Sequence, residues 1–228
     1  MKKRNWKKII GLTVFISFIL PVGFLVFRII HPNRELPRTE SDYLLMLVQC
    51  LLGIFALYMP SIISKRWKIE IPSGIYILYV VFLYCAIFLG EVTSFYYRVP
   101  HWDTYLHTFS GAMIGALGFS VISLLNKEEK IHMKLSPAFV AVFAFCFAVA
   151  LGAIWEIYEF TVDSIMELNM QKYATEEGIL KIGRESLNDT MKDIIVDTLG
   201  AIVISVIGYI SLKYKKGWVE KLLFSKKQ

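Results

Sequence analysis

Six long apolar runs, separated by short charged pieces, are the feature of this sequence that most constrains its fold. About 20 apolar residues, rising 1.5 Å per residue as a helix, cross the ~30 Å hydrocarbon core of a bilayer. The runs cover residues 9–30, 43–63, 73–90, 104–125, 136–160 and 193–212. We therefore expect an all-α, polytopic transmembrane bundle of about six helices. It would form a single integral membrane domain over residues 1–228, with an outer connector at 164–188.

Composition supports a membrane protein. Hydrophobic residues make up 56% of the chain, against about 45–50% in soluble domains. The net charge of +6 comes largely from lysines beside the apolar runs, which indicates contact with a membrane surface and argues against a nucleic-acid partner. The first run is too long for a cleaved signal peptide, so we expect an uncleaved signal anchor. The spacing of the cysteines suits neither a zinc site nor a redox pair, so we expect free thiols at Cys50, Cys85 and Cys146.

The distribution of basic residues predicts the orientation. If the N-terminus is cytoplasmic, 17 of the 25 lysines and arginines fall in cytoplasmic pieces and seven in outer pieces. The positive-inside rule therefore places both termini in the cytoplasm. Acidic residues show the opposite bias, because 15 of the 19 fall outside or at the outer ends of the apolar runs. The positive-inside rule does not require this bias of the acids, so the bias points to a function of the outer face.

Acids and a histidine recur at helical spacing where several runs meet the outer face. Four residues separate Asp103 from His107, and four separate Asp193 from Asp197, so each pair shares one helix face. Carboxylates at the ends of membrane-spanning helices need a basic partner, a proton, water or a metal ion. The basic residues available as partners are few: Arg28, Arg98, Arg184 and Lys192. They are too few to neutralise the acids one for one.

A bound divalent metal, such as Mg²⁺, Mn²⁺, Fe²⁺ or Zn²⁺, would balance this excess of negative charge. The predicted ligands or acid–base groups are Asp103, His107, Glu156, Glu159, Asp193 and Asp197. The residues predicted to support these ligands are Glu91, Asp163, Asp189 and Gly111. The sequence does not choose among the metals and does not indicate an oligomeric state.

Simpler explanations exist for several of these residues. Asp189 could cap the last helix, with Ser186 in a capping box, and acids near the interface could simply be hydrated. Glu156 and Asp197 are harder to explain in this way, because each is embedded in apolar sequence. Gly111 also begins a series of glycines that allows close packing of helices.

Three blocks carry a family resemblance. They are residues 102–107 with 110–111, residues 155–159, and residues 189–193 continuing to 197–201. In this order they resemble YjdF-like bacterial inner-membrane proteins over residues 90–212. The entry to the last helix is more distantly similar to VanZ-like membrane proteins. The resemblance implies a multi-pass protein of the bacterial cytoplasmic membrane and supplies no substrate.

No motif in the sequence names a reaction. Our leading hypothesis is an extracytoplasmic metal site that acts on a lipid or envelope head group, as in a metal-dependent membrane hydrolase. A cation- or proton-coupled transporter is the second hypothesis, although the middles of the runs offer few ionisable groups. A non-enzymatic membrane accessory protein is the third.

Overall fold

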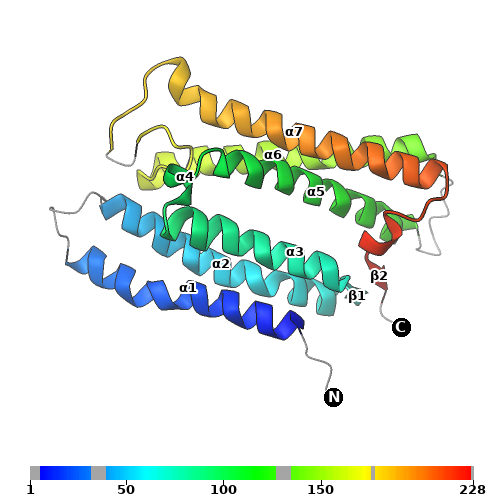
Figure 1. The fold of residues 1–228 in the computed structure, drawn as a ribbon, viewed down its shortest axis with the longest axis horizontal. Coiled ribbons are helices and arrows are strands. Elements are labelled where there is room, and N and C mark those ends of the chain that lie inside the picture. Colours follow the sequence, from blue (N-terminus) through cyan, green and yellow to red (C-terminus); the bar gives the residue numbers. More distant parts are fainter. Residues whose placement is uncertain (1–5, 32–39, 127–134, 176–177, 227–228) are drawn as a thin grey trace. The chain divides into compact units, whose positions relative to one another are not determined.

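The computed structural model describes residues 6–31, 40–126, 135–175 and 178–226 (Figure 1). Helices dominate these residues, with one short antiparallel strand pair. The seven α-helices are α1 (Trp6–Ile30), α2 (Glu40–Arg66), α3 (Ser73–Leu83), α4 (Phe95–Arg98), α5 (Trp102–Asn126), α6 (Pro137–Met166) and α7 (Arg184–Lys213). The remaining elements are the π-helix η1 (Tyr84–Val92), the 3-10 helix η2 (Glu220–Leu222), β1 (Ile69–Glu70) and β2 (Ser225–Lys226).

Six helical segments of the described residues are long and apolar enough to cross a membrane, which confirms the predicted fold class. The third segment is α3 continued by η1, so its C-terminal end is a π-helix rather than the regular helix expected from its sequence. Helix α6 extends to Met166, and α7 already begins at Arg184. The connector between α6 and α7 is therefore shorter than predicted and covers residues 167–183.

The chain divides into two compact units whose boundaries fall within helices. The first unit consists of residues 1–60, 76–103 and 156–191. Two of its apolar clusters are centred on Phe18 and Cys50, where α1 and α2 pack with α3 and η1. A third cluster joins Leu45 of α2 to Leu168 and Met170 of the connector. The connector is therefore folded into its unit and contributes to its core.

The second unit consists of residues 61–75, 104–155 and 192–228. Its core is formed by Phe119, Ile122, Val140 and Ala144 of α5 and α6, with Leu212 of α7 packed against them. The C-terminal segment returns to this unit, because β2 pairs with β1 in antiparallel register. The sequence did not predict this strand pair.

Small residues bring the helices of the second unit close together, as predicted for this glycine series. A Cβ atom added at Gly118 would lie 2.9 Å from the Cα of Ala144, and one added at Gly115 would collide with the Ile204 side chain. Helices α5, α6 and α7 therefore approach each other more closely than larger residues would permit.

Large apolar side chains cover much of the surface of the long helices. On α1, for example, Leu12, Leu20, Phe24 and Phe27 are each more than half exposed. Exposed apolar area on this scale suits a hydrocarbon solvent and is rare on a soluble monomer. These faces are the surfaces expected to meet lipid.

Candidate functional site

His107 lies between two acids of α7 in the second unit. Its Nδ1 atom is 3.2 Å from Oδ2 of Asp197, and its Nε2 atom is 3.9 Å from Oδ2 of Asp193. The two acids are four residues apart, so they occupy successive turns of one face of α7. Asp193 is 3% exposed and Asp197 is 4% exposed. The structure thus places two of the six predicted ligands, Asp193 and Asp197, beside the imidazole ring of a third.

Asp197 is held in place through both carboxylate oxygens. The Ser110 hydroxyl lies 2.7 Å from Oδ1 as a donor, while Oδ2 faces the His107 ring. Ser110 lies one turn after His107 on α5, and its hydroxyl is also 2.9 Å from the His107 carbonyl oxygen. This carbonyl and Asp197 Oδ1 therefore compete for the single proton of the hydroxyl. An acid fixed at both oxygens can in turn fix the orientation of the imidazole that it contacts.

Glycines make room for Asp197 on the two neighbouring helices, α5 and α6, and on α7 itself. A Cβ atom at Gly111 would collide with the Asp197 backbone, and one at Gly152 of α6 would lie 3.0 Å from Asp197 Oδ2. One turn later in the sequence, a Cβ atom at Gly200 would collide with the carbonyl oxygen of Thr108. The predicted supporting role of Gly111 therefore has a steric basis, because any larger residue would separate α5 from α7 at this level.

Asp103 approaches His107 from the same helix. It lies in the first turn of α5, one turn before the histidine, and offers a carboxylate oxygen within 4.8 Å of a ring nitrogen of His107. One ligand atom of Asp193 lies within the same distance of both, so Asp103, His107 and Asp193 could hold one metal ion. His107 is therefore the residue that lies close to all three acids, Asp103, Asp193 and Asp197.

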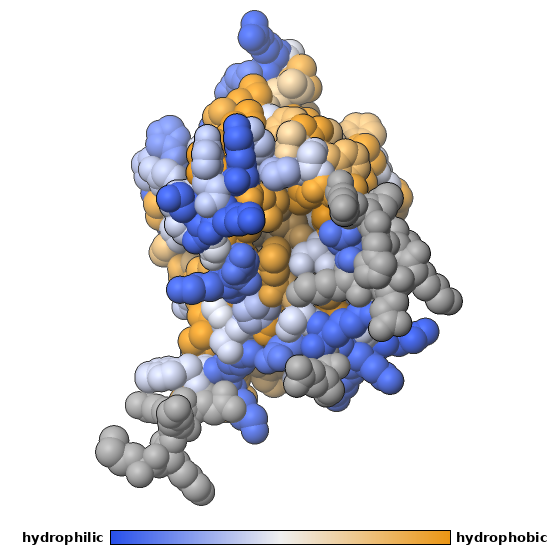
Figure 2. Space-filling view, turned by 90° about the vertical axis from the view of Figure 1, so that its right-hand side faces the viewer, coloured by the Kyte–Doolittle hydropathy of each residue, from blue (hydrophilic) through white to orange (hydrophobic). Residues whose placement is uncertain are grey.

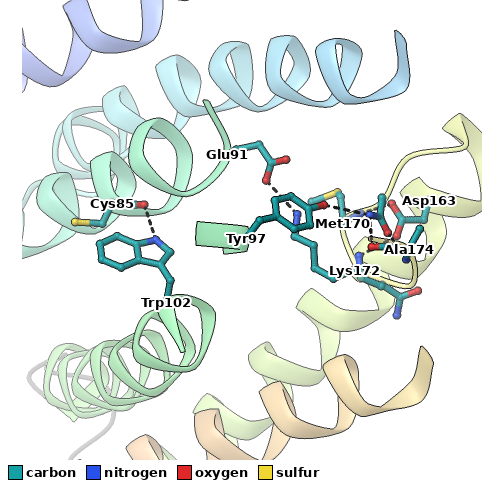
Figure 3. Close-up of polar contacts among 10 residues, drawn as sticks. Cys85, Glu91, Tyr97, Trp102, Asp163, Met170, Lys172 and Ala174 are labelled. Carbon is teal, nitrogen blue, oxygen red and sulfur yellow. Dashed lines mark hydrogen bonds and ion pairs between the residues drawn. The ribbon is translucent and has the colours of Figure 1, made fainter. Parts of the chain in front are cut away.

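A second polar cluster lies in the first unit, around Lys172 of the connector. Figure 3 shows the lysine directed toward Glu91 at the end of η1, with Tyr97 beside it. Lys172 Nζ is 3.3 Å from Glu91 Oε2, and it lies 4.9 Å and 5.2 Å from the ring centroids of Tyr96 and Tyr97. The lysine is 9% exposed and the glutamate 5% exposed. A buried ion pair with two aromatic faces thus anchors the connector to its unit.

The surroundings keep Lys172 charged. Burial alone would lower the pKa of its ammonium group, but the Glu91 carboxylate, with Tyr97, Asp103 and Glu159, raises that pKa above its usual 10.5. Lys172 therefore supplies positive charge to acids that appeared uncompensated in the sequence. The sequence argument missed it because it placed Lys172 in a loop and counted only basic residues near the ends of the spans.

Asp163 has a structural place in the connector. Its Oδ1 accepts a hydrogen bond from the backbone N–H of Met170 at 2.8 Å, and its Oδ2 accepts one from Gln171 at 2.9 Å (Figure 3). Beyond this turn, Asn169 donates to the Tyr97 hydroxyl at 3.2 Å and to the Ala174 carbonyl at 2.9 Å. These bonds satisfy backbone groups of residues 170, 171 and 174, which lie outside the helices.

The other predicted site residues belong to the first unit. Glu156 of α6 is 4% exposed, Glu159 is half-buried, and Asp189 is half-buried within α7. Asp189 does not cap a helix, because α7 begins five residues earlier at Arg184, and the Ser186 hydroxyl donates to the Gly183 carbonyl. Whether Glu156 and Glu159 act together with His107 stays a prediction.

A family described as "Predicted membrane protein (DUF2238)" matches residues 12–214. The chain belongs to this family. It is also similar to an uncharacterised protein of Thermotoga maritima, with 28% identity over 152 residues, which cover 67% of this chain and 70% of the relative. No solved structure matches the chain.

This match confirms a multi-pass membrane family, as the resemblance implied. The family description and the Thermotoga relative carry neither the YjdF-like nor the VanZ-like name. That part of the resemblance stays a prediction.

Proposed function

We propose that this membrane protein binds a divalent metal ion through Nε2 of His107 and the carboxylates of Asp193 and Asp103. Asp197 then accepts a hydrogen bond from Nδ1–H of His107 and holds the ring in the tautomer that leaves Nε2 free for the metal. The observation that carries the proposal is the pairing of the two ring nitrogens with two different buried acids, at 3.2 Å and 3.9 Å. Metal-bound histidines usually have such a carboxylate behind them.

The chemistry of these donors fits a divalent ion. Two carboxylates and one imidazole suit Mn²⁺, Fe²⁺ or Zn²⁺ and leave coordination positions open for water or a substrate oxygen. Because Asp193 and Asp197 are both buried on one face of α7, their mutual repulsion has to be offset in the folded protein. A protonated His107 alone would offset part of it, and this is the main competing explanation.

The proposed reaction class is metal-dependent hydrolysis of a lipid or envelope head group. When bound, the metal would polarise a phosphate oxygen or lower the pKa of a water molecule. The chain's own residues would position the metal and exclude bulk water, since Asp193 and Asp197 are buried and the His107 side chain is 12% exposed.

The proposed orientation places this site outside the cytoplasm. The ends of the spans that carry Lys65, Arg66, Lys213 and Lys216 would face the cytoplasm by the positive-inside rule. His107 and Asp193 lie toward the opposite ends of α5 and α7. The proposed location is the cytoplasmic membrane of a bacterial cell, with both termini inside.

Metal binding by the purified protein tests the proposal. We expect stoichiometric Mn²⁺ or Zn²⁺ in the wild-type protein and in a His101→Gln control, because His101 is exposed and lies outside the group. We expect His107→Ala and Asp193→Asn to lose the metal. Equal, negligible metal in all four proteins, with lowered thermal stability of the two site variants, would indicate an imidazolium held between acids and would reject the metal site.

A further inference from the structure

The second unit contains a cavity at the end opposite His107. Its volume is about 360 Å³, and it is a partly open pocket lined by the C-terminal part of α5, the start of α6, the end of α7 and the C-terminal segment. Eight of its ten lining residues are apolar, with Phe119, Val140 and Val219 among the most buried. The two polar residues are Ser123 and Asn126, which is exposed. The volume lies within the range of sites that hold small ligands.

The C-terminal segment is built into this cavity as one wall. The Ser211 hydroxyl accepts hydrogen bonds from the backbone N–H groups of Trp218 and Val219 at 3.0 Å and 3.3 Å. The Ser120 hydroxyl donates to the Leu222 carbonyl at 3.3 Å. Two side chains of this segment, Val219 and Leu223, therefore reach the cavity from fixed positions.

Basic side chains surround this end of the unit. Exposed lysines lie at the end of α7, in the segment after it and in β2; they are Lys213, Lys215, Lys216, Lys221 and Lys226. Pairing of β2 with β1 brings in the basic residues that precede β1, which are Lys65, Arg66 and Lys68. The acids of these two segments are Glu70 and Glu220. Figure 2 shows this face, where strongly hydrophilic side chains border a hydrophobic interior.

We infer that this cavity holds an acyl chain of an anionic phospholipid, with the lipid phosphate on the surrounding lysines. An apolar cavity at the end of membrane-spanning helices selects a hydrocarbon chain. Eight basic residues against two acidic ones favour a negative head group, since each lysine near an anionic surface contributes about 1 kcal/mol of binding free energy. This inference is independent of the metal site, because it uses the other end of the unit and different residues.

Thermal unfolding in a neutral detergent, with added lipid, tests the inference. We expect phosphatidylglycerol to raise the melting temperature of the wild-type protein by about 5 °C at saturation, as a ligand of the folded state does. Phosphatidylcholine with the same acyl chains should raise it much less. An equal effect of the two lipids would overturn the selection by charge.

Two kinds of variant locate the bound lipid. Ser123→Phe fills the cavity from α5 and should abolish the shift, and Asn126→Phe at the exposed edge provides a second block if the first variant does not fold. The pair Lys216→Gln and Lys221→Gln should weaken the apparent affinity for phosphatidylglycerol about tenfold or more.

A matched pair provides the control. Lys181→Gln with Arg184→Gln removes the same charge near the opposite end of α7, about 45 Å from Lys213 along the helix, and should retain the wild-type affinity. If both cavity-filling variants keep the full shift, or if the control pair weakens binding as much as the test pair, the lipid lies elsewhere and the inference is wrong.

Discussion

Nδ1 of His107 and Oδ2 of Asp197 lie 3.2 Å apart, although 90 residues separate them in the sequence. Replacing the acid with an amide of the same size should leave the ligand set intact but remove the charge behind the ring. We therefore expect Asp197→Asn to bind Mn²⁺ about 10–100-fold more weakly than wild type. Isothermal titration measures this loss. An unchanged affinity would mean that Asp197 does not position His107, and complete loss would make it a direct ligand.

Close packing around Asp197 predicts a strong effect of one added methyl group. Gly200→Ala would place a Cβ atom against the Thr108 carbonyl, so α5 and α7 would have to separate. We expect a loss of about 1–3 kcal/mol in unfolding free energy, together with weaker metal binding. Gly74→Ala is the matched control in the same unit, since nothing lies within 4 Å of a Cβ atom there. Equal stability of the two variants would contradict the close packing.

The buried pair of Lys172 and Glu91 predicts a non-additive effect. Lys172→Met leaves the Glu91 carboxylate buried without its 3.3 Å partner, which should cost about 3–5 kcal/mol of stability. The double variant Lys172→Met with Glu91→Gln should be more stable than Lys172→Met alone, because no unpaired charge remains buried. Thermal unfolding of the four proteins measures the coupling. Additive losses would show that the two side chains do not interact.

The contribution of Lys172 to stability should also decrease at alkaline pH. The folded protein holds the pKa of Lys172 above 10.5, the value expected for the unfolded chain. The unfolded state therefore releases this proton first, so the contribution of Lys172 is fully present below pH 10.5 and declines as the pH rises further. The stability difference between wild type and Lys172→Met should be constant from about pH 7 to 10 and then shrink. A difference that does not shrink as the pH rises above about 10.5 would contradict the raised pKa of Lys172.

The number of spans and three of the site residues could be predicted because they depend on local patterns. Apolar runs determine which segments can cross a bilayer, and spacing by four residues places Asp193 and Asp197 on one face of α7. Whether these acids converge on His107 depends on how α5 and α7 pack, which spacing along one helix does not specify. The glycine series that begins at Gly111 also predicted the close packing of helices at this level.

The roles of Lys172, Asp163 and the C-terminal segment could not be predicted, because they depend on chain reversals without a local signature. Lys172 reaches Glu91, 81 residues earlier, through an irregular connector. Asp163 accepts hydrogen bonds from the N–H groups of Met170 and Gln171, which face it only after the connector has folded back. Strands of two residues, such as β1 and β2, are too short to show an alternating pattern.

Pulsed electron paramagnetic resonance on the Mn²⁺-loaded protein tests the central claim most directly, since it detects a nitrogen nucleus bound to the metal. We predict a ¹⁴N coupling typical of a directly bound imidazole in wild type and in His101→Gln, and its loss in His107→Ala. Bound Mn²⁺ without any nitrogen coupling in the wild type would contradict His107 as a ligand, and so would a coupling that persists in His107→Ala.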